Sequence, residues 1–227
     1  MQIFTESFKS SPYWWENAPR PKIEIKTIPA KIDVAIIGSG YTGLCAAFTL
    51  AKAGCEVVVF DAEDAGWGCS SRNGGQVSTS IKPGLSKLRG QFGEAAANEI
   101  IKEGQNSLEW LKNFIAREKI DCSFRVPGRF FAAHSQREFD RLAANLKAQP
   151  ASLKVNAKLV TRAEQRKELG TDIYHGGAVF TSHASLDPAL YHSGLLAKVL
   201  KAGVTVITNC QVKKIRKHNA KFSLDTQ

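Results

Sequence analysis

The stretch IDVAIIGSGYTGLCAAFTLAKAGCEVVVFD, residues 32–61, decides the fold of this chain. It opens with a nearly continuous apolar run over 32–37, as expected for a parallel strand buried on both faces. Apolar residues at helical spacing follow over 41–53, and Gly54 stands where a helix usually ends. A second apolar run over 56–60 predicts another strand, which ends at Asp61. The order of these segments predicts a βαβ unit.

Three glycines mark the turn between the first strand and the helix. Gly38, Gly40 and Gly43 have the spacing G-x-G-x-x-G. The first glycine permits a tight turn, the second lets the backbone approach a pyrophosphate, and the third lets the helix pack closely on the strand. Asp61 follows Gly43 by 18 positions, close to the roughly 20 expected for a carboxylate that accepts ribose hydroxyls. These features predict a dinucleotide-binding unit.

Two other interpretations of this stretch are less favoured. A βαβ unit without a ligand has no need of three glycines at these offsets. A membrane span would use the 18 uncharged residues between Asp33 and Lys52, which is near the minimum for crossing a bilayer. However, Gly-Ser-Gly and then Tyr41 and Thr42 would break such a helix inside the bilayer. We therefore predict no membrane span.

The loop after Asp61 favours flavin over nicotinamide. Residues 62–80, AEDAGWGCSSRNGGQVSTS, contain four glycines, several hydroxyls, one arginine and one asparagine. Such a loop offers N–H groups and side-chain donors to phosphates, ribityl hydroxyls or a polar ring edge, and Arg72 adds a fixed positive charge. A simple nicotinamide-dependent dehydrogenase would normally enter another helix here. Because Asp61 also suits NAD, such a dehydrogenase stays an alternative.

The two glycine-rich motifs carry a resemblance. GSGYTG at 38–43 with GWGCSSRNGGQ at 66–76 resembles the FAD-dependent amine and amino-acid oxidase family related to D-amino-acid oxidase, and within it the gamma-glutamylputrescine oxidoreductase type. SPYWWENAP at 11–19 resembles the aromatic N-terminal segment of that subgroup. The resemblance implies an α/β fold, a Rossmann-like FAD-binding domain of the GR2 type with an inserted α+β substrate domain. It also implies that flavin oxidises a C–N bond of an amine or amino acid and that oxygen reoxidises it.

The resemblance further implies a set of cofactor-binding residues. The glycine turn would hold the pyrophosphate, Asp61 the adenosine ribose, the 70–76 loop the flavin, and the backbone of Val212 the adenine. The complete predicted set is Gly38, Ser39, Gly40, Tyr41, Thr42, Gly43, Asp61, Ala62, Ser70, Ser71, Arg72, Asn73, Gly74, Gly75, Gln76 and Val212. The chain departs from the family pattern at Asp61, where Glu is usual, and at Cys69, where a small residue is usual. No catalytic residue is predicted, and no histidine stands where it could tether the flavin.

The predicted domain organisation has four parts. They are an N-terminal arm (1–30), a first part of the FAD-binding domain (31–90), a partial inserted substrate domain (91–180) and a second part of the FAD-binding domain (181–227). Family members are considerably longer than 227 residues, so we expect a fold incomplete at the C-terminus and a missing C-terminal half or partner chain. The alternative function is accordingly a non-catalytic flavin- or nucleotide-binding fragment, or half of a split enzyme.

Local signals predict further elements. Helical spacing predicts a long amphipathic helix over 93–120, and Asp187-Pro188 predicts the start of another helix. Ser135 with Glu138 and Thr161 with Glu164 predict capped helices. Short strands are expected over 130–133, 204–207 and 211–216.

Composition restricts the function classes. The chain is 43% hydrophobic and 23% charged, as in soluble globular proteins, and its five scattered cysteines suggest reduced thiols in the cytoplasm. The net charge is +10, but no nucleic-acid motif accompanies the basic cluster over 213–221, so we interpret it as a solvated face. The histidines lack metal-ligand spacing, and His183 is interpreted as a loop or surface residue. We therefore predict no metal and no nucleic-acid partner.

Overall fold

The computed structural model describes residues 3–24 and 27–226. The remaining five residues belong to the predicted N-terminal arm and to the end of the predicted fourth part, and those predictions lie outside the described residues there. By its contacts the chain divides into two compact units. The first comprises the residues up to Gly75, Glu118–Ser123 and the residues from Asp187 onward, and the second comprises Gln76–Arg117 and Phe124–Leu186.

The boundaries of these units differ from the predicted domain limits near residues 90 and 180. The second unit begins at Gln76 because the short strands β3 (Gln76–Val77) and β7 (Ala184–Ser185) pair with each other. Residues 118–123 belong to the first unit, where Ile120 packs against Gly194 so closely that a Cβ on the glycine would lie 2.5 Å from the isoleucine side chain.

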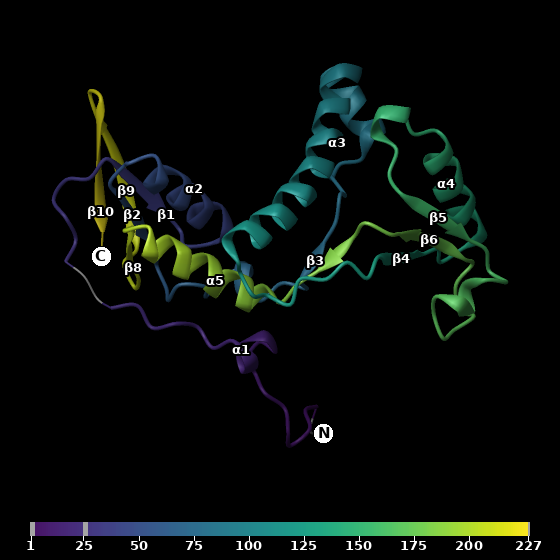
Figure 1. Cartoon of the computed structure of the whole chain (residues 1–227), viewed down its shortest axis with the longest axis horizontal. Coiled ribbons are helices and arrows are strands. Elements are labelled where there is room, and N and C mark those ends of the chain that lie inside the picture. Colours follow the sequence, from purple (N-terminus) through teal and green to yellow (C-terminus); the bar gives the residue numbers. More distant parts are fainter. Residues whose placement is uncertain (1–2, 25–26, 227) are drawn as a thin grey trace. The chain divides into compact units, whose positions relative to one another are not determined.

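The first unit is built on a three-stranded parallel sheet (Figure 1). Strand β2 (Val57–Phe60) lies between β1 (Val34–Ile37) and β8 (Thr205–Ile207). Helix α2 (Tyr41–Lys52) connects β1 to β2, and helix α5 (Pro188–Lys201) precedes β8. The βαβ unit, the helix at Asp187-Pro188 and the strand over 204–207 predicted from the sequence are therefore confirmed.

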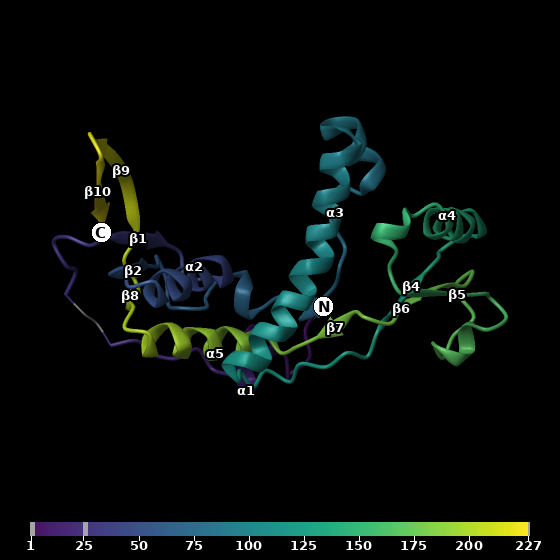
Figure 2. The ribbon, with the colours of Figure 1, turned by 45° about the horizontal axis from the view of Figure 1, so that its top comes forward.

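The core of the first unit lies between this sheet and its helices. All four residues of β2 are buried, as its continuous apolar sequence requires for a central strand. Helix α2 contacts both the sheet and α5, and the two helices lie side by side (Figures 1 and 2). Leu44 from α2 and Leu195 from α5 are fully buried. Burial of a leucine side chain contributes about 1.5–3 kcal/mol, so this helix pair stabilises the unit strongly.

Helix α5 begins with the N-cap predicted from the sequence. The Asp187 carboxylate accepts hydrogen bonds from the backbone N–H groups of Ala189 and Leu190, at 2.9 and 3.0 Å, and Pro188 occupies the first turn. At the other end, Gly203 adopts φ +88°, the left-handed conformation that ends helices.

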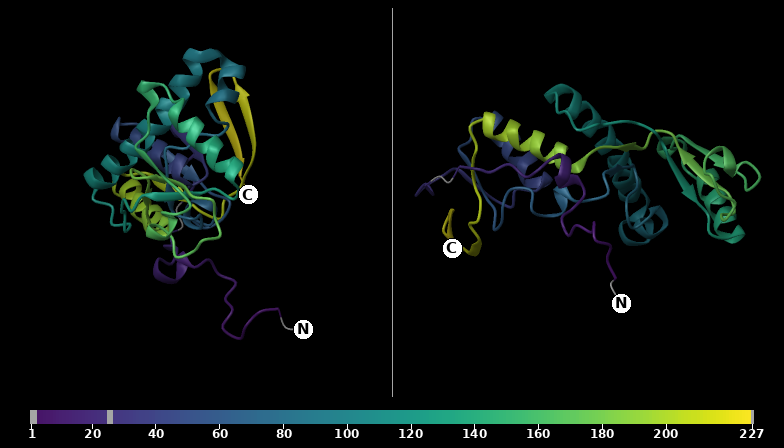
Figure 3. Two further views of the ribbon diagram at one scale, coloured as in Figure 1. Left: turned by 90° about the vertical axis from the view of Figure 1, so that its right-hand side faces the viewer. Right: turned by 90° about the horizontal axis from the view of Figure 1, so that it is seen from below.

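The last two strands form a hairpin. Strands β9 (Val212–His218) and β10 (Lys221–Thr226) pair antiparallel around Asn219, which has φ +55° (Figure 3). Among the described residues, neither pairs with the parallel sheet. The predicted strand over 211–216 exists, and its basic residues are exposed.

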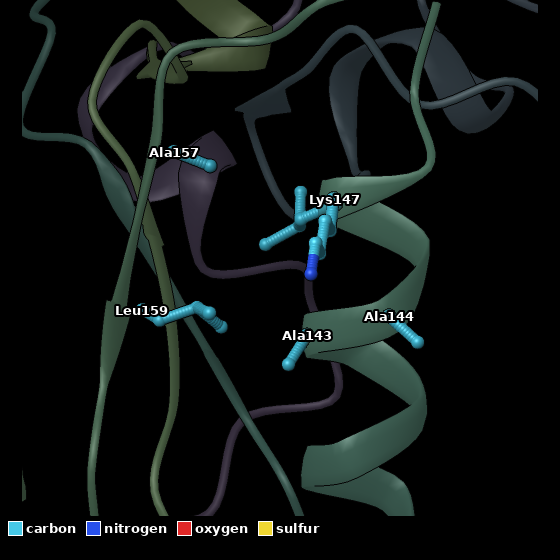
Figure 4. Close-up of a pocket in the computed structure, with 6 residues that line it drawn as sticks. Ala143, Ala144, Lys147, Ala157 and Leu159 are labelled. Atoms are coloured by element: carbon cyan, nitrogen blue, oxygen red, sulfur yellow. The ribbon is translucent and has the colours of Figure 1, made fainter.

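The second unit contains a three-stranded antiparallel sheet, in which β6 (Gly177–Phe180) lies between β4 (Arg129–Ala132) and β5 (Ala157–Val160). Helix α4 (Gln136–Lys147) and β5 line an apolar hollow (Figure 4), formed by Ala143, Ala144, Leu146, Lys147, Ala157 and Leu159.

The predicted helices of this unit differ from the observed ones in two places. The segment α3 (Leu85–Glu118) is interrupted at Gly93, which has φ 78° and ψ 170°. The predicted helix began at residue 93, but helical structure is also present before that residue. The Thr161–Glu164 signal leads only to a 3-10 turn, η3 (Gln165–Lys167), although Thr161 Oγ1 donates to the Glu164 carboxylate at 2.8 Å. The Ser135–Glu138 cap of α4 is confirmed, because the Ser135 hydroxyl accepts from Glu138 N.

His183 corrects another expectation. It is 3% exposed, stacks on Phe180, and its Nε2 lies 3.2 Å from Thr79 Oγ1. His183 lies outside the helices and strands, as expected for a loop residue, but a surface position is wrong, because the ring belongs to the packed interior of the second unit. None of the helices within 3–24 and 27–226 is long and apolar enough to cross a membrane.

Candidate functional site

The glycine turn has the geometry that its spacing predicts. Gly38 adopts φ +97°, which L-residues rarely adopt, and its N–H donates to the Phe60 carbonyl at 2.7 Å. A Cβ on Gly43 would lie 2.0 Å from the Gly38 carbonyl oxygen. The third glycine is thus required for the close approach of α2 to the end of β1.

The N-terminus of α2 is open to an acceptor. Gly40 is the N-cap residue and has no side chain to offer, so the N–H groups of the first turn need other partners. One of them, Tyr41 N, donates to Ser70 Oγ at 3.1 Å, and a Cβ on Gly40 would lie 3.0 Å from the same hydroxyl. This end of a helix favours an anion, because its N–H groups and its dipole both present positive charge.

Asp61 is bonded to the glycine turn. Its Oδ2 accepts hydrogen bonds from Ser39 N at 2.7 Å and Ser39 Oγ at 2.5 Å, and its Oδ1 accepts one from Glu63 N at 3.0 Å. A carboxylate offers about four acceptor positions, so Oδ1 retains one for a hydroxyl group. The carboxylate therefore both fixes the turn and remains able to accept from a ribose.

The loop Gly66–Gly75 lies over the same turn and is tied together by its own polar groups. The Ser71 hydroxyl, which is buried, donates to the Gly66 carbonyl. The Asn73 amide donates to Cys69 O and Ser70 O at 3.1 and 3.3 Å, and its oxygen accepts from Gly75 N at 2.8 Å. These bonds fold the loop into one compact turn around η1 (Cys69–Ser71).

Helix α5 supports the turn through a buried histidine, His192, which is not among the residues predicted from the sequence. His192 Nε2 lies 2.7 Å from the Ser39 carbonyl oxygen, and because a carbonyl only accepts, the nitrogen carries the proton. Burial lowers the pKa of His192 against the opposing effects of the Ser39 hydrogen bond and the Asp61 charge, which favours the neutral ring. A sequence signal existed, because His192 falls on the face that Pro188, Tyr191, Leu195 and Val199 define at helical spacing.

Tyr41 contributes its backbone to the turn but directs its side chain elsewhere. Its hydroxyl donates to the Pro188 carbonyl at 3.1 Å, and its ring packs edge-on against Tyr191 at 5.0 Å between centroids. Burial raises the pKa of Tyr41 to about 12, so the phenol stays protonated and serves as a donor.

The structure brings most of the predicted residues together. Gly38–Gly43, Asp61 and Ser70–Gly75 all belong to the first unit, and Ala62 and Thr42 are exposed beside them. Val212 packs against a cluster that includes Phe60 and Ile207, the last residues of β2 and β8. Gln76 is different, because it pairs with Ser185 in the second unit. No group of three potential metal ligands occurs in the described part of the chain.

A comparison with protein families decides the relationship. The family model described as DAO, FAD dependent oxidoreductase, matches residues 33–227.

This chain belongs to the DAO family of FAD-dependent oxidoreductases. The resemblance inferred from the two glycine-rich motifs and the prediction of FAD as the cofactor are thereby confirmed.

Curated members with similar sequences include oxidoreductases of bacteria. The DAO-family chain is 29% identical over 218 residues to the probable oxidoreductase OrdL of Rhizobium meliloti, covering 94% of this chain and 51% of the relative. It is 31% identical over 156 residues to the gamma-glutamylputrescine oxidoreductase of Escherichia coli, covering 69% of this chain and 36% of the relative. The chain thus spans about half or less of these relatives.

Solved structures confirm the fold class of the DAO-family chain. Glycine oxidase from Geobacillus kaustophilus superposes with a TM-score of 0.72 at 19% identity, over 86% of this chain and 51% of that one. L-Amino acid deaminase from Proteus myxofaciens superposes with a TM-score of 0.71 at 20% identity, over 92% of this chain and 46% of the deaminase chain. The Rossmann-like FAD-binding architecture predicted from the sequence is therefore confirmed.

The polar groups of the first unit match the chemical groups of FAD, independently of the family comparison. The turn at Gly38–Gly43 leaves positive helix-end N–H groups beside a residue without a side chain, as a pyrophosphate requires. Asp61 retains acceptor capacity at the end of β2. The adjoining Gly66–Gly75 loop is rich in N–H and hydroxyl groups, as the polar parts of a flavin require.

Proposed function

We propose that the first unit binds FAD through the residues predicted from the sequence. The backbone of Gly38–Gly43 would take the pyrophosphate, Asp61 and Ala62 the adenosine ribose, Ser70–Gly75 the flavin, and Val212 the adenine. Gln76, the remaining predicted residue, belongs to the second unit and is not part of this proposal. The observation that carries this proposal is the geometry of the turn, in which Asp61 fixes Ser39 while Gly40 leaves the N-terminus of α2 without a side-chain cap of its own. The family match of residues 33–227 supports it.

The proposed reaction is oxidation of the C–N bond of an amine or amino acid. Among the relatives, the gamma-glutamylputrescine oxidoreductase supports an amine, and the glycine oxidase and L-amino acid deaminase folds are compatible with an amino acid. When bound, FAD would supply the hydride acceptor for this oxidation, with oxygen as the reoxidant. Because the chain spans about half of its relatives, this activity is proposed for the protein to which the chain belongs.

The residues of this chain act on the cofactor by position and electrostatics. The N-terminus of α2 and the charge of Arg72 would stabilise the pyrophosphate, and the Asp61 carboxylate would orient the ribose. The loop from Ser70 would hold the polar parts of the flavin through its N–H and hydroxyl groups. We assign no proton transfer to any residue.

The five cysteines are free of disulfides, which supports a reducing, cytoplasmic setting.

Reconstitution with FAD tests the binding half of the proposal. The purified chain is incubated with FAD, free cofactor is removed, and the visible absorption spectrum is recorded. We expect a retained flavin spectrum in the natural chain and its loss in Gly40→Val, whose side chain would collide with Ser70 and block the turn. Gly170→Ala, in the second unit, is the matched control, because a Cβ there meets nothing within 4 Å. Full FAD retention by Gly40→Val would contradict the proposal.

Anaerobic bleaching tests the reaction. Gamma-glutamylputrescine, putrescine, glycine and other amino acids are added separately to the flavin-loaded protein, and loss of the oxidised flavin absorbance is followed. We expect bleaching by an amine or amino acid and recovery of colour with air. A coloured protein that none of these compounds bleaches would contradict the proposed reaction while leaving FAD binding intact.

A further inference from the structure

We propose that residues Trp14–Arg20 form an N-terminal strap, a positioning element that holds the Gly66–Gly75 loop in its cofactor-binding conformation. The inference rests on the proposed FAD site and adds to it a segment that lies some 50 residues away in sequence. The strap and the loop both belong to the first unit.

Two indole N–H groups join the strap to the loop. Trp15 Nε1 donates to Ser71 Oγ at 2.8 Å, and that hydroxyl in turn donates to the Gly66 carbonyl. Trp14 Nε1 donates to the Asn73 carbonyl, also at 2.8 Å. The first bond reaches a buried serine that closes the loop, and the second reaches the residue whose amide makes three bonds within it. The strap therefore contacts the loop at the two residues that organise it.

A cationic stack reinforces this attachment. The Arg20 guanidinium lies over the Trp15 ring at 4.4 Å and over the Trp67 ring at 4.8 Å, and the two rings are 5.7 Å apart. Arg20 also forms an ion pair with Asp64 at 3.0 Å. The guanidinium lies beside both indoles, within cation–π distance of each, and the two rings also contact each other. Trp67, within the loop, is thus held by the same residue that packs on Trp15.

The burial of the strap indicates that the indoles serve this contact. Residues 3–11 are exposed, whereas Trp14, Trp15 and Arg20 are partly buried and Ala18 is buried. Helix α1 (Trp14–Asn17) has only four residues and no side-chain cap, so it has little stability of its own. Its contacts with the loop therefore order both segments together.

The test replaces the indole donors while it keeps aromatic rings in place. In the double variant Trp14→Phe/Trp15→Phe both hydrogen bonds are lost, but a ring remains for Arg20. We expect the dissociation constant for FAD to rise roughly tenfold, because the binding-competent loop becomes a smaller fraction of the population. Tyr13→Phe is the matched control, since Tyr13 is 67% exposed, and it should bind FAD as the natural chain does.

Amide hydrogen exchange of the cofactor-free chain provides a second readout that needs no ligand. The double variant should exchange faster over 66–75 and unchanged over 44–60, and the melting temperature without FAD should shift little. If the double variant does not fold, each single variant removes one bond and is measured in its place. The flavin absorption band of the loaded variants should also move toward that of free FAD.

The outcomes separate this inference from the proposed function. Faster exchange over 66–75 with weaker FAD binding supports the strap. Unchanged exchange overturns it, as does unchanged FAD affinity in a variant whose loop exchanges faster. If the natural chain binds no FAD, the proposed function fails, and the strap as a cofactor-positioning element falls with it, even where exchange shows that the indoles hold the loop.

Discussion

His192 donates a hydrogen bond from Nε2 to the carbonyl oxygen of Ser39 at 2.7 Å, joining helix α5 to the glycine turn across 153 positions of sequence. The imidazole also fills the space beside Gly66, where a Cβ would lie 2.9 Å from the ring. Since Ser39 and His192 are both about 1% exposed, water cannot replace the bond. One buried side chain thus supports both the turn and the start of the loop.

Removal of this donor should destabilise the first unit. His192→Phe keeps a ring but leaves the Ser39 carbonyl buried without a partner, which costs about 1–3 kcal/mol of the free energy of unfolding. His192→Gln retains a donor and should lose less. Urea unfolding of the cofactor-free chain measures both. His218→Gln, at an exposed position of β9, is the control and should change the free energy of unfolding by less than about 0.5 kcal/mol. Equal stability of His192→Phe and the natural chain would contradict this role.

Acidification should weaken the fold through the same histidine. Burial lowers the pKa of His192 below the value near 6.5 of an unfolded chain. Below about pH 6.5 the unfolded state therefore binds more protons than the folded state. As the pH decreases from there, the free energy of unfolding decreases until the pH reaches the lowered pKa of the folded state. His183 acts in the same direction, since burial and then the charge of Arg129 lower its pKa.

Urea unfolding at pH 7.5 and 5.5 measures this dependence. The loss of stability between the two values should be smaller in His192→Gln and in His183→Gln than in the natural chain, because each variant removes one of the two buried groups. His134→Gln, at an exposed position, should retain the natural dependence. The interpretation fails if His192→Gln loses as much stability on acidification as the natural chain does.

The third glycine of the turn should tolerate no side chain. In Gly43→Ala the new Cβ would lie 2.0 Å from a backbone oxygen, which cannot move aside as a flexible side chain can. We expect a loss of about 1–3 kcal/mol or more from overpacking, together with loss of FAD retention. Gly170→Ala, in the second unit, should retain both properties, because its Cβ would meet no atom within 4 Å. Thermal unfolding and the flavin spectrum provide the measurements, and a stable, yellow Gly43→Ala protein would show that α2 can move away from β1.

The parts of this site that were predictable are those with local causes. Glycine spacing, the apolar run of β2 and the Asp187-Pro188 cap each determine structure within a few residues, and the fold follows them. The break at Gly93 was not predictable in the same way, because helical spacing continues on both sides of it. Only the backbone at φ 78° distinguishes a helix start from a kink there.

Long-range polar contacts were the part that sequence could not supply. The partners of Trp15 and His192 lie 56 and 153 positions away, and no periodicity connects such residues. Aromatic and histidine side chains on a buried face could equally pack without hydrogen bonds. The sequence therefore predicted the glycine turn, Asp61 and the following loop as candidate segments, and the fold determined which side chains hold those segments together.

The acid at the end of β2 should contribute to FAD affinity in two ways. In Asp61→Asn, the amide oxygen can accept either from Ser39 or from the N–H of Glu63, and the amide nitrogen then faces the other donor. At least one hydrogen bond is therefore lost along with the charge. Hydrogen bonds to charged groups contribute about 1.5–3 kcal/mol, which corresponds to a rise of roughly ten- to a hundredfold in the dissociation constant for FAD.

Fluorescence titration of the cofactor-free chain with FAD measures this change. Glu63→Gln is the matched control, since Glu63 takes part through its backbone N–H and its side chain is exposed, and it should bind FAD as tightly as the natural chain. Asp61→Ala, which removes all three acceptor contacts, should bind more weakly than Asp61→Asn. If Asp61→Asn and Glu63→Gln bind FAD equally well, the carboxylate only shapes the turn, and the ribose is held by other groups.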